Sequence, residues 1–126
     1  MLAQSQGNEM GKLTTHVLDT ARGQPAAGVV IEIYRLDGAQ REKLGQTRTN
    51  SDGRCDSPIL EGAALRQGQY ELVFHAGDYL RASGQAAAGL LFLDEIPIRF
   101  GIEDASAHYH VPLLVSPFAF STYRGS

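Results

Sequence analysis

The amino-acid sequence predicts an all-β protein, a two-sheet β-sandwich of about eight strands with one short helix after the fifth strand. Turn-forming residues recur at short intervals, and the runs between them are rich in β-branched and aromatic residues. Within several runs apolar residues occupy every second position, as expected for strands with one face on a core. Short strands separated by frequent turns are typical of a β-sandwich. The expected turns are Arg22-Gly23-Gln24-Pro25, Asp37-Gly38, Asn50-Ser51-Asp52-Gly53, Gln67-Gly68 and Gly101.

The first strand, expected over residues 12–19, has two chemically different faces. Successive side chains of a strand point to opposite sides of the sheet, so every second residue shares a face. We expect one set to face the core and the other to face away from it. The core set is Leu13, Thr15 and Val17, and the outward set is Thr14, His16 and Leu18.

The remaining elements follow from the same pattern. Residues 76–83 lack the period of two and contain Tyr79, Leu80 and Ala82, which favours a short surface helix followed by a loop. The other strands are expected over residues 28–36, 43–49, 57–60, 69–75, 95–101, 107–115 and 117–124.

Length and composition indicate one folded unit. The chain has 126 residues, of which 43% are hydrophobic and 20% are charged, as in ordinary globular domains. A domain of this size can bury a core without disulfides. We therefore expect a single domain over residues 12–126, preceded by a short polar leader over residues 1–11 that is disordered.

Charge and hydropathy exclude several classes of partner. The net charge is -3, and no run of Lys or Arg is longer than two, which argues against nucleic acid. No apolar stretch approaches the roughly 20 residues that a membrane span needs, and the first residues lack the apolar region of a secretory signal. Cys55 is the single cysteine and cannot form an internal disulfide. We therefore expect a cytoplasmic location and no membrane partner.

His16 and Arg54 are the first candidates for chemistry. His16 is expected on the outward face of its strand, and Arg54 follows the Asp52-Gly53 turn. A histidine titrates near neutral pH and can transfer protons, while an arginine presents a fixed positive charge to anions. Taken singly, each is also compatible with an ordinary solvated surface residue.

His108 and His110 lie two residues apart and are expected on one strand face, opposite the apolar residues Tyr109 and Val111. A His-x-His pair can bind zinc, and His16 or His75 would then complete a site of three ligands. The sequence contains no Cys-x-x-Cys or His-Glu-x-x-His motif that would support a metal. It also contains no Gly-x-Ser-x-Gly elbow and no glycine-rich phosphate loop.

Four motifs together make the sequence similar to the 5-hydroxyisourate hydrolase family, the transthyretin-related enzymes of urate breakdown. They are L-T-T-H-V-L-D at residues 13–19, D-G-R at 52–54, H-Y-H-V-P-L-L at 108–114 and S-T-Y-R-G-S at 121–126. The resemblance runs from about residue 12 to the end. Transthyretin, a hormone carrier of the same fold, lacks the terminal motif and the residues equivalent to His16, Arg54 and His110. Residues 91–94 replace an aromatic-proline pair that is common in the family, which affects the shape of a loop.

The resemblance implies a transthyretin-like sandwich that assembles as a homotetramer, a dimer of dimers with active sites in the cleft between dimers. The implied reaction is hydrolysis of 5-hydroxyisourate to 2-oxo-4-hydroxy-4-carboxy-5-ureidoimidazoline, with no metal and no organic cofactor. The implied catalytic residues are His16, Arg54, His110 and Ser126, and the supporting residues are His108, Tyr123, Arg124 and Gly125.

The same resemblance suggests a role for each residue. His16 and His110 would activate water and transfer protons, with the choice of general base left open. Arg54 would orient the substrate and stabilise developing charge. Ser126 would approach the site with its hydroxyl or its carboxylate, held there by residues 123–125. His108 would tune His110 or contact the substrate.

Three alternatives remain at this point. The chain could be a non-catalytic small-molecule carrier, as transthyretin is, or a plain interaction module that shares only the turns. Cys55 could act as a covalent nucleophile, but it has no evident activating partner beyond Arg54. We expect Cys55 to be a small packed residue.

Overall fold

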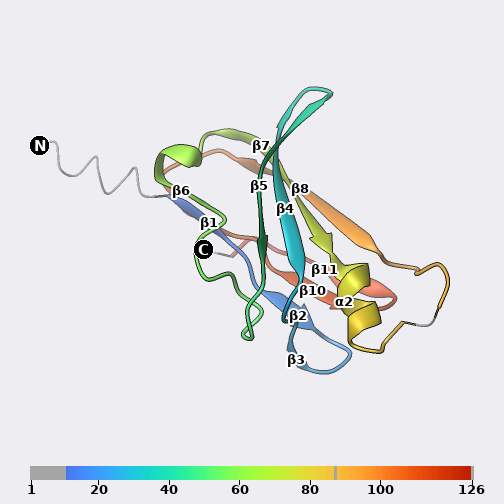
Figure 1. Ribbon diagram of the computed structural model, residues 1–126. Helices are drawn as coiled ribbons and strands as arrows, with labels where there is room; N and C mark the ends of the chain where they lie inside the picture. Colours follow the sequence, from blue (N-terminus) through green and yellow to red (C-terminus); the bar gives the residue numbers. More distant parts are fainter. Residues whose placement is uncertain (1–10, 87, 126) are drawn as a thin grey trace, which may run out of the picture.

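The computed structural model describes residues 11–86 and 88–125, which form a β-sandwich (Figure 1). The helical segments are a short 3₁₀ helix η1 (Gly62–Ala64) and the α-helix α2 (Ala76–Ala82). The strands are β1 (Lys12–Thr14), β2 (Val17–Asp19), β3 (Gln24–Pro25), β4 (Val30–Asp37), β5 (Gln40–Arg48), β6 (Leu60–Glu61), β7 (Gly68–His75), β8 (Glu95–Ile102), β9 (His108–His110), β10 (Leu113–Ser116) and β11 (Ala119–Ser121).

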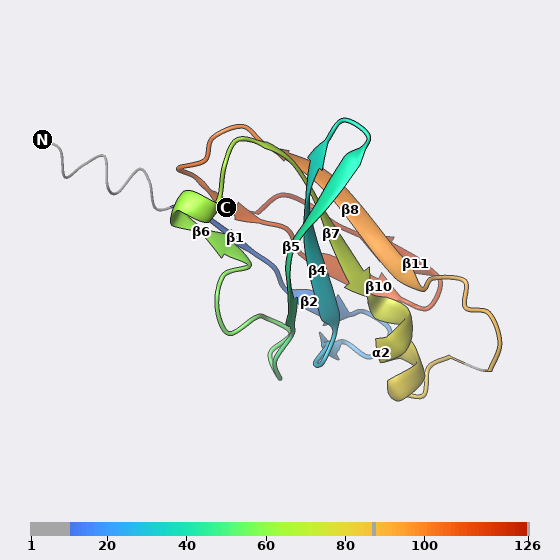
Figure 2. The same ribbon diagram turned by 45° about the horizontal axis from the view of Figure 1, so that its top comes forward.

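The strands form two layers (Figures 1 and 2). One layer is an antiparallel sheet in the order β5-β4-β7-β8. The other consists of two short sheets, β6-β1-β9 and β11-β10-β2-β3. The chain passes from β1 into β2 and from β9 into β10, so these two short sheets continue one another. The predicted all-β, two-sheet sandwich with a helix after the strand ending at residue 75 is confirmed.

Two predicted strands are each interrupted once. The strand predicted over residues 12–19 breaks at Thr15 and His16, and the one predicted over 107–115 breaks at Val111 and Pro112. Pro112 has no backbone N–H to give to a ladder, which explains the second break. The backbone pairing resumes at once, because Leu113 N donates to the His16 carbonyl at 2.9 Å.

Other boundaries also differ from the prediction. The strand predicted over residues 57–60 was wrong for most of its length, since β6 contains only Leu60 of that range. The final strand is limited to Ala119–Ser121, and β3 was not predicted. β3 is a two-residue partner of β2 after the turn at Gly23, and so short a pairing leaves no periodic pattern in the sequence.

The core lies between the two layers and follows the predicted alternation. In the first strand the predicted core set is buried, while Thr14, His16 and Leu18 are only partly buried. The four-stranded sheet contributes buried aromatic and aliphatic side chains from β4, β7 and β8. Burial of each large apolar side chain contributes about 1.5–3 kcal/mol. The largest fully buried side chains include Leu13, Val17, Ile31, Tyr70, Leu72, Phe74, Ile96 and Leu113.

Hydrogen bonds to the buried carboxylate of Asp19 connect helix α2 and the residues after it to β2. Tyr79 Oη donates to Asp19 Oδ2 at 2.6 Å, and Gln85 Nε2 donates to the same oxygen at 2.8 Å. Burial, and then the contact with Asp19, raise the pKa of Tyr79 to about 12. Among the described residues no helix is long and apolar enough to cross a membrane.

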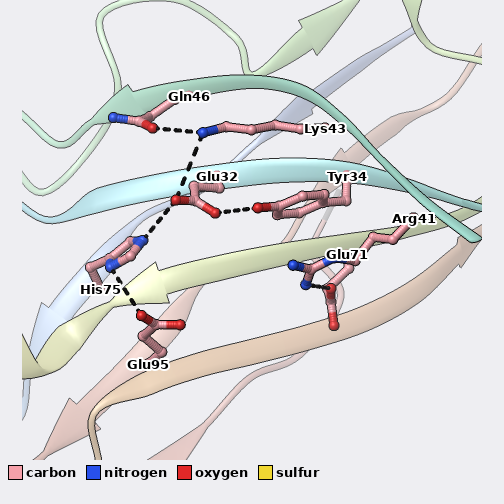
Figure 3. A network of polar contacts seen from close by, with 8 residues as sticks. All are labelled: Glu32, Tyr34, Arg41, Lys43, Gln46, Glu71, His75 and Glu95. Carbon is pink, nitrogen blue, oxygen red and sulfur yellow. Dashed lines mark hydrogen bonds and ion pairs between the residues drawn. The ribbon is translucent and has the colours of Figure 1, made fainter.

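The outer face of the four-stranded sheet carries a network of charged residues (Figure 3). Glu32 accepts hydrogen bonds from Tyr34 Oη at 2.5 Å and from His75 Nε2 at 3.1 Å. Glu71, only 3% exposed, accepts from Arg41 at 2.7 Å and from Arg99 at 3.1 Å. This network occupies the layer that does not contain β1, β2, β9 and β10.

The expected leader lies outside the described residues except for Gly11. Gly11 is buried, and its carbonyl accepts a hydrogen bond from Gly62 N at 2.9 Å. A Cβ at this position would lie 2.1 Å from the Ala105 carbonyl oxygen, so a larger residue does not fit without a shift.

Candidate active site

Parallel pairing between the first and last strands brings the candidate histidines together. β1 pairs with β9 in the register Lys12↔His108 and Thr14↔His110. β2 pairs with β10 in the same direction, starting at Leu113↔Val17. Paired residues in neighbouring strands point to the same face, so Thr14, His108 and His110 share the outward face of this sheet. His16 lies on that face too, two residues beyond Thr14 along the chain.

Thr14 lies between the two imidazoles of the His-x-His pair. Its Oγ1 is 2.8 Å from His108 Nε2 and 2.9 Å from His110 Nδ1. The two rings are 6.3 Å apart between centroids and are inclined by 67°. Thr14 was not among the site residues predicted from the sequence. Its position on the same strand face as His16 is the sequence feature that could have indicated a role.

His16 is held by the loop that carries Arg54. Its Nε2 lies 2.8 Å from the backbone carbonyl oxygen of Asp52. A carbonyl oxygen only accepts hydrogen bonds, so the proton of this bond is on Nε2. In neutral His16 the basic nitrogen is therefore Nδ1.

Residues 50–54 form a tight turn that is built around Asn50. The Asn50 Oδ1 accepts hydrogen bonds from Asp52 N at 2.8 Å and from Arg54 N at 3.2 Å. Gly53 has a φ of +75°, and a Cβ there would lie 2.4 Å from the Val17 carbonyl oxygen. Glycine is therefore needed for both the backbone conformation and the close approach to β2. The turn fixes the backbone of Arg54 beside the histidines.

Arg54 borders a surface pocket of about 230 Å³ next to the histidines. The pocket is open to solvent and has a mixed polar and apolar lining, with Thr14 on one side. Its lining residues are Lys12, Thr14, Thr15, Arg54, Cys55, Asp56, Ser57 and Pro58. Two cations, Lys12 and Arg54, and one acid, Asp56, line the pocket, and the excess of positive charge suits it to an anionic or electron-rich small molecule.

Both histidines of the pair have a lowered pKa. Burial, followed by the nearby charges of Arg54, His108 and His16, lowers the pKa of His110. Burial and the charge of Lys12 lower the pKa of His108. An imidazole whose pKa lies below its usual value is neutral at pH 7 and can accept a proton.

The C-terminal segment is attached to the same strand. Gly125 N donates to the His110 carbonyl at 2.7 Å, and His110 N donates to the Gly125 carbonyl at 3.3 Å. Arg124 lies 4.3 Å above the ring centroid of Tyr109, a cation–π contact. Thr122 Oγ1 donates to the Pro112 carbonyl at 2.7 Å. The tail therefore runs along β9 and its continuation.

The structure thus gathers most of the predicted site residues but not all of them. His16, Arg54, His108, His110 and Gly125 lie at one surface. Arg124 contacts the backbone and the ring next to the histidines, and Tyr123 is exposed. Ser126 lies outside the described residues.

His75 and Cys55 do not fit the roles of metal ligand and covalent nucleophile that the sequence left open. His75 is in the other layer, where it donates to Glu32. Cys55 is partly buried, and burial raises the pKa of its thiol, which disfavours the nucleophilic thiolate. Within residues 11–86 and 88–125, no three His, Cys, Asp or Glu side chains form a group that could hold a metal ion.

This arrangement can perform acid–base chemistry beside a fixed positive charge. A neutral imidazole can take a proton from water, a second histidine can give or receive one, and a guanidinium can stabilise an oxyanion. Addition of water to a carbonyl group is accelerated by each of these functions.

Comparison with known proteins gives a consistent result. The sequence model of the HIUase/Transthyretin family matches residues 13–125. A 5-hydroxyisourate hydrolase of Mesorhizobium japonicum is 58% identical over 99% of this chain and 100% of its own length. The structure of Klebsiella pneumoniae 5-hydroxyisourate hydrolase is 34% identical, with a TM-score of 0.76 over 93% of this chain and 100% of that chain. An (S)-allantoin synthase structure is 48% identical, with a TM-score of 0.87 over 93% of this chain, which spans 44% of that longer protein.

Proposed function

The chain belongs to the HIUase/Transthyretin family and hydrolyses 5-hydroxyisourate, and we propose that His16, Arg54 and His110 carry out the reaction. The observation that carries this assignment is the placement of both histidines on one outward sheet face beside the Arg54 turn. The proposed product is 2-oxo-4-hydroxy-4-carboxy-5-ureidoimidazoline.

In the proposed mechanism His110 is the general base. Its lowered pKa leaves it neutral, and it accepts a proton from water while the water oxygen bonds to a ring carbonyl carbon. The carbonyl oxygen becomes an oxyanion, which Arg54 stabilises. The C–N bond then breaks, its electron pair stays on nitrogen, and that nitrogen receives a proton from a histidine.

His16 is proposed to exchange a proton with the leaving nitrogen or with the substrate oxygen. Because its Nε2 donates to the Asp52 carbonyl, proton exchange with the substrate takes place at Nδ1. The proton lost by water passes to His110, and the proton gained by the leaving nitrogen comes from His110 or His16. Neither a metal ion nor an organic cofactor takes part.

The C-terminal residues are proposed to complete the site. Support comes from the two backbone hydrogen bonds between Gly125 and His110. Ser126 follows Gly125 directly, so we propose that its hydroxyl reaches the reacting water or His110. Arg124, packed on Tyr109, holds the tail, and Tyr123 and Gly125 set its path.

The proposed assembly is a homotetramer, a dimer of dimers in which the outward histidine face lines a cleft between dimers. Support comes from the aromatic residues on the edge strand β11 and the nearby loops. Phe118 is 76% exposed, Phe92 73% and Phe120 44%, and the Phe92 and Phe118 rings lie 6.0 Å apart. Exposed aromatic clusters of this kind are typical of protein–protein contacts.

We also propose a cytoplasmic location, in keeping with the free thiol of Cys55.

The test uses urate that is being oxidised by urate oxidase, which generates 5-hydroxyisourate in the cuvette. Purified protein is added, and the decay of the 5-hydroxyisourate absorbance is followed over time. We expect decay much faster than the spontaneous rate and proportional to protein concentration. A decay rate equal to the spontaneous one would overturn the assignment.

A further inference from the structure

We propose that Thr14 is a positioning residue, whose hydroxyl links His108 to His110 and leaves Nε2 of His110 unprotonated toward the substrate. This inference rests on the proposed function, because it assumes that His110 is the base. Its geometric basis is the position of Thr14 Oγ1, 2.8 Å from His108 Nε2 and 2.9 Å from His110 Nδ1.

The hydrogen-bonding capacity of the hydroxyl makes the two imidazoles interdependent. A threonine hydroxyl has one proton to donate and two lone pairs to accept with. If it donates to His108, it can only accept from His110, whose proton is then on Nδ1. If it donates to His110, the Nδ1 of that ring is unprotonated and the proton of neutral His110 is on Nε2. The direction of one O–H bond therefore sets the tautomer of His110.

The surroundings of His110 leave Nε2 as the nitrogen available to a substrate. Nδ1 lies 2.9 Å from Thr14 Oγ1, whereas within residues 11–86 and 88–125 no hydrogen bond to Nε2 of His110 is found. A base at Nε2 needs its proton on Nδ1, which requires Thr14 to accept from His110 and donate to His108. That arrangement satisfies the hydroxyl and both ring nitrogens.

His108 must remain neutral for this arrangement, because a protonated His108 has no acceptor to offer. Burial and Lys12, its register partner in β1, both lower the pKa of His108. Among the described residues, Lys12, Arg54 and Arg124 bring positive charge near the pair, His16 is a further titratable neighbour, and Asp56 is the one acid of the adjoining pocket. The positive neighbours favour two neutral imidazoles.

The strand register fixes the hydroxyl in place. Thr14 is paired with His110 in the parallel ladder, and Val111 N donates to the Thr14 carbonyl at 2.9 Å. The β-branched side chain of threonine has restricted χ1 rotation in a strand, which keeps Oγ1 between the rings. Valine has nearly the same shape without the hydroxyl, and serine keeps the hydroxyl without the methyl group.

The test combines ring-nitrogen NMR on the resting protein with steady-state kinetics. Protein labelled with ¹⁵N-histidine reports directly which nitrogen of His110 carries the proton. In the unmodified protein we expect the proton on Nδ1. In Thr14→Val we expect a mixture of tautomers and a kcat lower by about 10- to 100-fold, in line with the loss of a residue that orients a functional imidazole. KM should stay within about twofold, and Thr14→Ser should restore both the tautomer and most of kcat.

Thr15→Val is the matched control. Thr15 is adjacent to Thr14 but points to the core, where its Oγ1 donates to the Val111 carbonyl at 2.7 Å. The same substitution there should lower stability and leave the His110 tautomer unchanged. The inference is overturned if the unmodified protein carries the His110 proton on Nε2, or if Thr14→Val keeps both tautomer and kcat. Because the tautomer is read without substrate, its result is independent of the turnover assay that tests the proposed function.

Discussion

His110 and Gly125 exchange two backbone hydrogen bonds, so the segment around Gly125 lies against one of the two histidines proposed to react with substrate. The contact is close, because a Cβ at Gly125 would lie 3.0 Å from Cδ2 and 3.1 Å from Cβ of His110. The absence of a side chain at residue 125 thus allows the tail to lie flat on the imidazole. The position of the His110 ring and the path of the tail depend on each other.

We predict that Gly125→Ala impairs turnover without unfolding the protein. The added methyl group must displace the His110 ring by a few tenths of an ångström, and small displacements of a reacting group are costly. We expect kcat to fall by about tenfold. Gly101→Ala is the matched control, since nothing lies within 4 Å of a Cβ at that position. Equal activity in the two variants would contradict the prediction.

Removal of residues 124–126 should abolish most of the activity while leaving the sandwich folded. The deletion removes the Arg124 contact with Tyr109 and the backbone pairing with His110, both of which lie outside the buried core. A cation–π contact of this kind contributes about 0.5–1 kcal/mol, which is a small part of total stability. Thermal unfolding and the 5-hydroxyisourate assay measure the two effects separately. A fully active truncated protein would show that the tail has no part in the site.

His110→Asn should lower the hydrolysis rate by about 10²-fold or more, because asparagine cannot transfer a proton at neutral pH. His75→Asn is a suitable control, because His75 lies in the other layer and is bound to Glu32. We expect the control variant to keep the normal rate. Equal rates for His110→Asn and the unmodified protein would remove His110 from the mechanism.

Arg54→Gln should raise the pKa of His110. Burial is the largest cause of the lowered pKa, and the Arg54 charge is the next, because a positive neighbour disfavours the imidazolium form. Without this charge His110 protonates at higher pH, and the acidic limb of the kcat/KM profile moves upward with it. An NMR titration of the His110 ring measures the shift directly. Arg48→Gln removes an exposed arginine of β5 instead and should leave the titration unchanged.

Glu71→Gln should destabilise the protein at pH 7 by about 1–3 kcal/mol, the usual contribution of hydrogen bonds to charged groups. Burial alone would raise the pKa of Glu71, but the hydrogen bonds from Arg41 and Arg99 outweigh it, and the pKa lies below its ordinary value of 4.5. A carboxylate with a lowered folded pKa contributes stability above its unfolded pKa, and loses it as pH falls through the folded value.

The difference in the free energy of unfolding between Glu71→Gln and the unmodified protein should therefore become smaller as the pH falls below about 4.5. Urea unfolding at a series of pH values measures it. Glu42→Gln, at an exposed position of β5, is the control and should change stability by less than about 0.5 kcal/mol. A difference that persists unchanged at acidic pH would show that the carboxylate charge is not the cause.

The strand faces could be predicted from the sequence because alternation is a local property. Leu13 and Val17 are buried and His16 is not, as their spacing indicated. The break at Pro112 was also visible in principle, because proline cannot donate to a ladder. The break at Thr15 and His16 was not, since it follows from pairing with a segment almost a hundred residues away.

The role of Thr14 could not be predicted for the same reason. The residue is one of two neighbouring threonines, and only the parallel register with β9 places its hydroxyl between His108 and His110. Likewise, the sequence gives Arg54 no direction. Its position depends on the Asn50-centred turn and on the close approach of Gly53 to β2.

The parallel pairing of β1 with β9 has a consequence for biosynthesis. β1 can pair with β6 once residues 60–61 have been made, but its other partner, β9, follows only at residues 108–110, so the β1–β9 side of this layer cannot form before then. Contacts between such distant segments form slowly, because a long loop must be closed first. The histidine surface therefore arises only once residues 108–110 have been made, and a copy terminated before them remains inert toward the substrate.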